Sequence, residues 1–470
     1  MQRLSAKAIG LGSLLVGGTA LALGAKIGDF EHTAEQDRVA EVDALDRESS
    51  DDLVDEPGEQ PVVVAVPPPP PPIEAPRYLV DVPDDAFRKA LAYQFNAPLY
   101  ARASSQRKVV GHVRRNVTLP VSRIVSGDGC SGTWYEVSGM GYVCSGDGFA
   151  VSTSPSPLDA DLHSRLPDVD RSLPYRYAKV ETQGTPLFSR IPTPEEERQA
   201  IDGGKDAVRE RLEGAIFVAV DRVVEDGGRR FVRTVRGHYV RRADVHMLEP
   251  TSMHGEHFGD EPAPVAFVYV EGAALYDRQT FEPRGMAMRY ARFAVDDLVE
   301  RDDKRWVVTA DGYAIEREHV RIADFVEPPD RIPDDVKWVH VDLAQQTLVA
   351  YEGRKPVMAT LISGGAEGFE APLGVFRVHK KHVTRTMAGP DPDAGRYEVA
   401  EVPWTLYYWG SYALHGAYWH DDFGNVRSHG CTNIPPRDAR WLFYWSEPEI
   451  PQGWHATFGR LGPWLYFTGG

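Results

Sequence analysis

The sequence is short of several residue types and patterns, and each shortage argues against a class of protein. It holds only three cysteines and no Cys-x-x-Cys pair of the kind that is typical of structural zinc sites. Long runs of Ala, Leu, Glu and Lys are scarce, which argues against a helical protein, and no basic stripe points to nucleic acid. Glycine (43) and proline (36) are abundant instead, so the composition predicts a mainly β protein with many turns.

The net charge of −17 is concentrated near the N-terminus. Between Asp29 and Glu59 thirteen Asp and Glu stand against two Arg, so eleven of the seventeen net negative charges lie there. Such a segment repels itself and stays solvated, and Pro67 to Pro72 favour polyproline II at about 3.1 Å per residue. Residues 29–77 are therefore predicted to be an extended tether, and the folded part is predicted to begin near residue 78.

The first 28 residues have the pattern of an export signal. Arg3 and Lys7 precede an apolar stretch from Ala8 to Ala25 that is rich in small residues. No cysteine follows this stretch, which argues against a lipoprotein signal. Residues 1–28 are predicted to be a cleaved signal or an uncleaved anchor that contacts the inner membrane, and the protein is predicted to be exported to the periplasm or cell envelope.

The cysteines divide into a neighbouring pair and one isolated residue. Cys130 and Cys144 lie close together in one β-like segment, which predicts a disulfide in an oxidising compartment. Two half-buried thiols in a cytosolic domain are the alternative. Cys431 then has no partner, and an unpaired thiol in an exported protein indicates reactivity.

A weak repeat follows the tether. Trp134, Phe231 and Trp306 each precede a Gly-Tyr-like pair by six or seven residues, among alternating apolar positions that predict small β-barrels. These segments resemble bacterial SH3-like domains, and the first is the best match. The resemblance implies modules over residues 78–160, 170–250 and 262–328 that bind cell-wall glycan or peptide. Ordinary β-hairpins are the alternative, and each of the three aromatic residues is expected to belong to a core.

Three helices are expected among these strands. Residues 81–95 have helical periodicity after an Asp cap, and an insertion near Thr193 to Glu213 begins with a capping Thr followed by Pro-Glu-Glu-Glu. In the C-terminal domain, placed at residues 334–470, alternating apolar residues predict several strands. A helix is predicted after Pro436.

Chemistry is concentrated in a short C-terminal segment. It reads His415-Gly416-Ala-Tyr-Trp419-His and, after seven residues, Ser428-His429-Gly430-Cys431-Thr-Asn433. A cysteine attacks a carbonyl as thiolate and therefore needs a base, for which His415 and His429 are the candidates. Gly430 lets the backbone turn tightly and expose N–H groups to an oxyanion.

This segment resembles the L,D-transpeptidase (YkuD-type) family of peptidoglycan enzymes over roughly a quarter of the chain. The resemblance implies a β-sandwich catalytic domain with Cys431 as nucleophile and His415 as base, and no metal or organic cofactor. It also implies that the Gly416 carbonyl orients the imidazole, that amides around His429, Gly430 and Cys431 form an oxyanion hole, and that Ser428 supports the site. Trp419 and Asn433 are the expected substrate-binding residues. Tyr408 belongs to an aromatic run with Trp404, Tyr407 and Trp409 that is either cleft wall or strand core, and Tyr408 is also expected to bind substrate. Thr432 departs from the family in occupying a position that is usually apolar.

The predicted reaction is acyl transfer from a peptidoglycan stem peptide, with release of D-Ala, to an amine of another stem or of a wall-attached protein. Three alternatives stay open at this point. Water as acceptor would make the enzyme an L,D-carboxypeptidase, and a decayed site would make it a non-catalytic wall-binding scaffold. A zinc site formed by His415, His420, His429 and Cys431 is the third.

Overall fold

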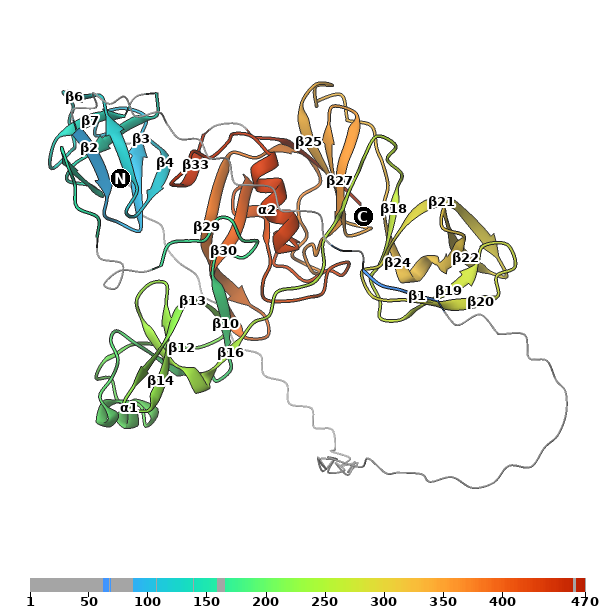
Figure 1. Cartoon of the computed structure of the whole chain (residues 1–470), viewed down its shortest axis with the longest axis horizontal. Helices are drawn as coiled ribbons and strands as arrows, with labels where there is room; N and C mark the ends of the chain where they lie inside the picture. The colour runs from blue at the N-terminus through green and yellow to red at the C-terminus, as the bar shows by residue number, and fades with distance from the viewer. Residues whose placement is uncertain are drawn as a thin grey trace, which may run out of the picture. The chain divides into compact units, whose positions relative to one another are not determined.

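The computed structural model describes residues 62–66, 68, 88–106, 108–137, 139–158, 165–459 and 462–469. Strands dominate these residues, as predicted, and only two α-helices occur among them, α1 (Pro194–Ile201) and α2 (Pro436–Trp445) (Figure 1). The predicted signal at residues 1–28 and most of the tether lie outside the described residues. Within the described part of the chain, no helix is both long and apolar enough to span a membrane.

The first repeat contains β2 to β9. The helix that was predicted over residues 81–95 is wrong where the structure describes it, because β2 (Arg88–Ala92) and the start of β3 (Asn96–Tyr100) lie there. β2 pairs on both sides, with β5 (Thr118–Val121) and β9 (Phe149–Ser152), and buries its last three residues. Pairing along both edges thus outweighs the helical preference of an alanine-rich segment.

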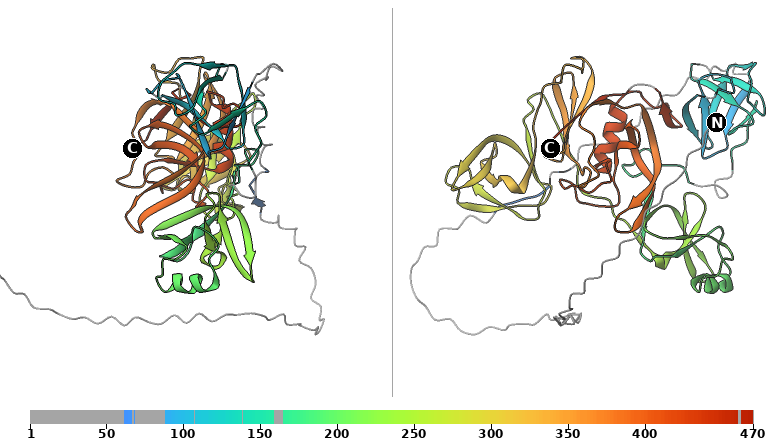
Figure 2. Two further views of the ribbon diagram at one scale, coloured as in Figure 1. Left: turned by 90° about the vertical axis from the view of Figure 1, so that its left-hand side faces the viewer. Right: turned by 180° about the vertical axis from the view of Figure 1, so that it is seen from behind.

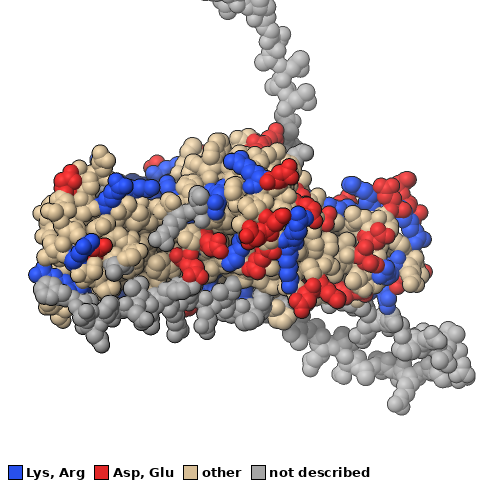
Figure 3. Space-filling view, turned by 90° about the horizontal axis from the view of Figure 1, so that it is seen from above, with Lys and Arg blue, Asp and Glu red and all other residues tan. Residues whose placement is uncertain are grey.

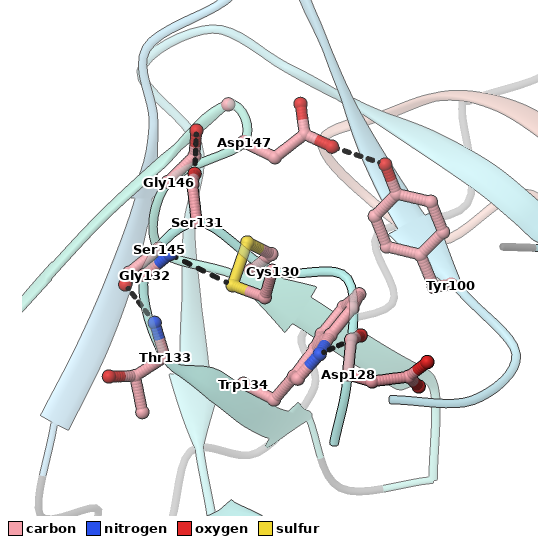
Figure 4. Close-up of a disulfide and its surroundings, with 12 residues drawn as sticks. Tyr100, Asp128, Cys130, Ser131, Gly132, Thr133, Trp134, Ser145, Gly146 and Asp147 are labelled. Carbon is pink, nitrogen blue, oxygen red and sulfur yellow. Dashed lines mark hydrogen bonds between the residues drawn. A yellow bond between two sulfur atoms is a disulfide. The ribbon is translucent and has the colours of Figure 1, made fainter. Parts of the chain in front are cut away.

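The predicted disulfide between Cys130 and Cys144 is confirmed (Figure 4). It lies beside Trp134, which is 2% exposed and donates its indole N–H to the Asp128 carbonyl at 2.9 Å. Tyr100 packs edge-on against the same indole, so the disulfide and the two rings form one small core. Cys431 is the one free cysteine in the chain.

The second and third repeats share one order of elements. A long strand, a hairpin partner, a short strand, a 3-10 turn and a closing strand follow one another in each. The second repeat has β13 (Ala215–Asp226), β14 (Arg229–Thr234), β15 (Tyr239–Arg241), η1 (Arg242–Asp244) and β16 (Val245–Met247), and the third has β21 (Arg292–Arg301), β22 (Lys304–Thr309), β23 (Tyr313–Glu316), η2 (Arg317–His319) and β24 (Val320–Ala323). Phe231 and Trp306 are buried at equivalent places, as expected of core residues. The likeness to SH3 domains stays a prediction.

Two local predictions near these repeats need correction. The insertion in the second repeat does begin as a helix, because Thr193 and Glu196 form a capping box, but α1 ends at Ile201 and β12 (Val208–Leu212) follows. Within the predicted tether, Val62–Val64 form β1 and pair in parallel with β20 (Pro283–Ala287) of the third repeat. That part of the segment is therefore a strand.

The C-terminal domain consists of two packed sheets, as the predicted sandwich requires. One sheet has the order β17-β27-β26-β25-β34-β28. The other contains a long hairpin of β29 (Lys380–Asp391) and β30 (Gly395–Trp409), orange in Figures 1 and 2, followed by β31 (Tyr412–Gly416) and β32 (Thr432–Ile434). A shared core joins the two sheets and includes Val339 and Leu348 from the first and Leu406 and Leu414 from the second. The predicted helix after Pro436 is α2, which packs against β30.

The remaining strands of the domain have the following bounds: β17 (Glu256–His257), β25 (Lys337–Asp342), β26 (Thr347–Glu352), β27 (Lys355–Leu361), β28 (Gly374–Arg377), β33 (Trp454–Phe458) and β34 (Trp464–Thr468). On the face drawn in Figure 3, Lys and Arg lie interspersed with Asp and Glu.

Candidate active site

Two adjacent parallel strands position the predicted catalytic pair. β31 (Tyr412–Gly416) pairs with β32 (Thr432–Ile434), and His415 lies directly opposite Asn433. Cys431 immediately precedes β32 and follows the turn that leads into it. His415 and Cys431 line the same cleft, so the structure brings the two candidates to one site.

The turn before Cys431 is held by Ser428. The Ser428 hydroxyl donates to the Cys431 carbonyl and accepts the Gly430 amide at 3.1 Å. Gly430 has φ +109°, and a Cβ at this position would lie 2.8 Å from a ring carbon of Tyr412. A glycine is required there both by its conformation and by the lack of space.

Cys431 is half-buried, and its Sγ lies 3.6 Å from the Ser411 carbonyl oxygen. Burial raises the pKa of the thiol to about 11, and the Ala413 amide acts in the opposite direction by donating to the sulfur. The Cys431 thiol is therefore neutral at pH 7.

His415 is 2% exposed, and its Nδ1 has no hydrogen-bond partner among the described residues. Burial lowers the pKa of the imidazole to about 4, although the carbonyls of Gly416 and of His415 itself favour the protonated ring. The ring is therefore neutral near pH 7 and is able to accept a proton. A neutral thiol beside a neutral base is the resting state of this pair.

Both residues line a cleft of about 480 Å³. One wall comes from the strands and turn just described, including Ser428, His429, Asn433 and Trp419. A second wall is formed by the β29–β30 hairpin, and a third by β13 of the second repeat. The hairpin wall consists of Met387, Asp391, Pro392, Asp393, Tyr397 and Val399, and the β13 wall consists of Ala215 and Phe217.

His429 is engaged by the hairpin. Its Nε2 lies 3.3 Å from a carboxylate oxygen of Asp391, and its ring stacks on Tyr397 with centroids 4.9 Å apart. Phe369 meets the same ring edge-on. These contacts engage one face and one nitrogen of the His429 ring, which favours His415 over His429 as the base.

Asn433 is held in place by His420, a residue that the sequence indicated only as a candidate zinc ligand. Its side-chain amide lies 2.8 Å from His420 Nε2, while the Asp422 amide donates to His420 Nδ1 at 3.2 Å. Burial lowers the pKa of His420 to about 3, so the ring is neutral and carries its proton on Nε2. That proton needs an acceptor, which assigns the amide oxygen of Asn433 to His420 and leaves its NH₂ group for the cleft. His420 and His429 thus have partners other than a shared metal ion.

The predicted substrate-binding residues differ in position. Trp419 and Asn433 line the cleft, and the Trp419 ring lies 5.5 Å from that of His415. Tyr408 does not line it, because the ring is 4% exposed and stacks on Phe467 in the core. Its expected role in binding is therefore wrong, because it occupies an inward-facing position of β30.

The second repeat is joined to the catalytic sheet. β13 pairs in parallel with β30, with Phe217 opposite Val399. Tyr177 stacks on Tyr418 at 3.6 Å and donates to the Glu401 carbonyl at 2.9 Å. Sequence reasoning missed this wall, because no local pattern indicates which distant strand β13 pairs with.

Comparisons with known proteins agree with this geometry. Residues 336–451 match the family described as the L,D-transpeptidase catalytic domain (YkuD). A comparison with curated proteins gave no match. The C-terminal domain of this chain accordingly has a YkuD-like catalytic fold.

Three solved structures illustrate the similarity. A cysteine-to-serine mutant of the Enterococcus faecium L,D-transpeptidase is 24% identical over 29% of this chain and 50% of that chain, with a TM-score of 0.24. The E. faecium catalytic domain is 25% identical over 28% of this chain and 98% of that one, with a TM-score of 0.24. L,D-transpeptidase 3 from Mycobacterium tuberculosis is 15% identical over 37% and 79%, with a TM-score of 0.24. The chain spans about half the length of the first of these structures.

Proposed function

We propose that this chain, whose C-terminal domain matches the L,D-transpeptidase family, is a peptidoglycan L,D-transpeptidase. His415 takes the proton of the Cys431 thiol as Sγ attacks the carbonyl carbon of the residue that precedes the terminal D-Ala of a stem tetrapeptide. The C–N bond breaks, D-Ala leaves with the proton, and a thioester remains on Cys431. An amine of another stem, or of a wall-attached protein, then attacks the thioester and regenerates the thiol.

The shared cleft of His415 and Cys431 carries this proposal. β31 holds His415 beside β32, Cys431 immediately precedes β32, and both residues line the cleft. A neutral imidazole next to a neutral thiol suits general-base activation in the transition state rather than a preformed ion pair. The Gly416 carbonyl, which favours the protonated ring, is suited to stabilise the imidazolium that forms.

The oxyanion site is expected to use fewer amides than the sequence suggested. Gly430 N–H already donates to the Ser428 hydroxyl, so we assign the developing oxyanion to the amides of His429 and Cys431. Ser428 then acts by holding the turn in shape. Trp419 and Asn433 are assigned to substrate binding, since both line the cleft next to His415.

The compartment is also part of the proposal. The Cys130–Cys144 disulfide and the apolar N-terminal stretch both support export to the periplasm or cell envelope, where peptidoglycan is the substrate at hand.

A product assay tests the function. Purified protein is incubated with disaccharide-tetrapeptide and the products are identified by mass spectrometry. Cross-linked dimers and free D-Ala are expected from wild type and from Leu298→Ala, an exposed control in the third repeat, and neither product is expected from Cys431→Ala. Tripeptide alone would establish the carboxypeptidase. Absence of both products from folded wild type would contradict catalysis and favour the scaffold.

A further inference from the structure

A second cavity, of about 560 Å³, lies where the first repeat meets the catalytic domain. β4 (Val109–Arg114) of the first repeat pairs with β33, which pairs in turn with β29, so the cavity is built on one continuous set of strands. We call it the basic pocket, after six of its lining residues: Lys108, His112, His379, Lys380, His382 and Arg385. No Asp or Glu lines it.

The three permanent cations of the basic pocket have no acidic partners. Among the described residues, no carboxylate oxygen lies within 4.0 Å of Lys108, Lys380 or Arg385. Elsewhere arginines of this chain are commonly paired, as Arg236 is with Glu401 at 2.5 Å. In a chain with a net charge of −17, acidic residues outnumber basic ones, so composition does not explain three cations without a carboxylate partner around one cavity.

This gathering of like charge has an electrostatic cost. Burial first, and the nearby Arg385 second, lower the pKa of His112 to about 4. Burial lowers the pKa of His382 to about 2, with further contributions from His455, Arg385, His112 and Lys380. A bound anion would relieve the repulsion between these neighbouring positive groups. A cluster of like charges that costs stability is expected mainly at functional sites.

Aromatic rings give the basic pocket a fixed frame. Phe458 lies 5.1 Å from the His112 ring and 5.2 Å from the His382 ring, and Tyr407 lies 5.7 Å from His382 between ring centroids. Tyr407 also connects the pocket to the candidate active site, because it lies opposite Ala413 on β31, the strand that carries His415. The pocket and the candidate active site are therefore built on neighbouring strands.

We propose that the basic pocket binds an oxyanion, a carboxylate or a phosphate, carried by a cell-wall polymer. Arg385 offers a planar fork that suits either group, and Lys108 and Lys380 add point charges from the two sides. The site takes one wall from the first repeat and the other from the catalytic domain. A bound anion would therefore contact the first repeat and the catalytic domain together, and it would do so whichever reaction Cys431 performs.

Calorimetric titration of the full chain at constant ionic strength tests this site, with inorganic phosphate in one arm and a tetrapeptide bearing two carboxylates in the other. Because the tetrapeptide also binds in the catalytic cleft, the proposal is supported by binding that substitutions in the basic pocket weaken, and the arm that is weakened more identifies the source of the oxyanion. The double variant Lys380→Gln/Arg385→Gln is expected to weaken binding at least tenfold. Arg396→Gln, an exposed arginine of the same hairpin that pairs with Glu398, is the control and should bind as wild type does.

Two results would overturn the proposal: no binding in either arm, or binding that the double variant leaves unchanged. A second measurement distinguishes binding in the basic pocket from a general effect of removing two positive charges from the protein. NMR titration of the histidine rings should show the pKa of His112 rising when the probe binds to wild type, and no such rise in the double variant.

Discussion

The phenyl ring of Phe217, on β13 of the second repeat, lies 6.5 Å from the indole of Trp419, which in turn lies next to the imidazole of His415. A residue almost two hundred positions before His415 therefore lines the same cleft. The second repeat was predicted to bind wall glycan or peptide. Its position shows that it also lines the cleft that holds His415 and Cys431.

Phe217→Ala is therefore expected to raise KM for the tetrapeptide severalfold while kcat changes less, because the cleft loses an apolar wall and not a reacting group. Phe217→Leu should restore most of the affinity, since much of the buried apolar surface remains. Steady-state kinetics of both variants check this. Equal KM values for wild type and Phe217→Ala would show that β13 does not contact the substrate.

Gly430→Ala tests the shape of the turn before the nucleophile. The new methyl group meets Tyr412 in a backbone conformation with φ +109°, so the turn must shift and the amides around it move with it. We expect a loss in kcat of about 10²–10³-fold, as for removal of an oxyanion donor. Gly312→Ala is the control. It introduces a similar strain in the backbone, at φ +88° with open space around the new methyl group, and should leave kcat unchanged.

The resting ionisation of the catalytic pair predicts the pH profile. Because the pKa of His415 is about 4 and that of Cys431 about 11, the reactive neutral pair is present from about pH 5 to 10. The value of kcat/KM should fall as pH drops through 4, where the imidazole gains its proton, and should be flat through neutrality. Thiolate absorbance at pH 7 should be absent from the free enzyme. An acid limb near pH 6 to 7 together with visible thiolate would indicate an ion pair instead.

The disulfide of the first repeat is expected to affect stability and not chemistry. It closes a loop with a sequence separation of 14, and a loop of this length is worth about 3 kcal/mol of unfolding free energy. The double variant Cys130→Ser/Cys144→Ser should therefore lower the denaturant midpoint of the first repeat while thioester formation at Cys431 persists. Loss of thioester formation with the rest of the chain folded would show that this repeat is needed for catalysis.

The sequence predicted the features that depend on neighbouring residues. The Ser428-to-Cys431 turn, the capping box at Thr193, the short-range disulfide and the helix after Pro436 all follow from patterns within about 15 residues. The failures depend on distant pairing. Residues 88–92 are a strand because β5 and β9 pair with both sides of it, and β1 joins β20 more than two hundred residues away.

The same limit applies to the candidate site. His415 and Cys431 could be named from their motif, but the Asp391 carboxylate that holds His429 and the Phe217 wall lie on elements with no local signal. Tyr408 was assigned to the substrate for its place in an aromatic run. Strand alternation turns it inward, and only the register of β30 shows which residues of that run face the core.

The central claim is that Cys431 carries the acyl group and that His415 activates it. Intact-mass measurement after brief mixing with the tetrapeptide tests this directly. Wild type should gain the mass of the tetrapeptide less D-Ala, located on Cys431 by digestion, while His415→Gln should acylate at least a hundredfold more slowly and Cys431→Ala not at all. An adduct on another residue, or equal acylation of wild type and His415→Gln, would contradict the account.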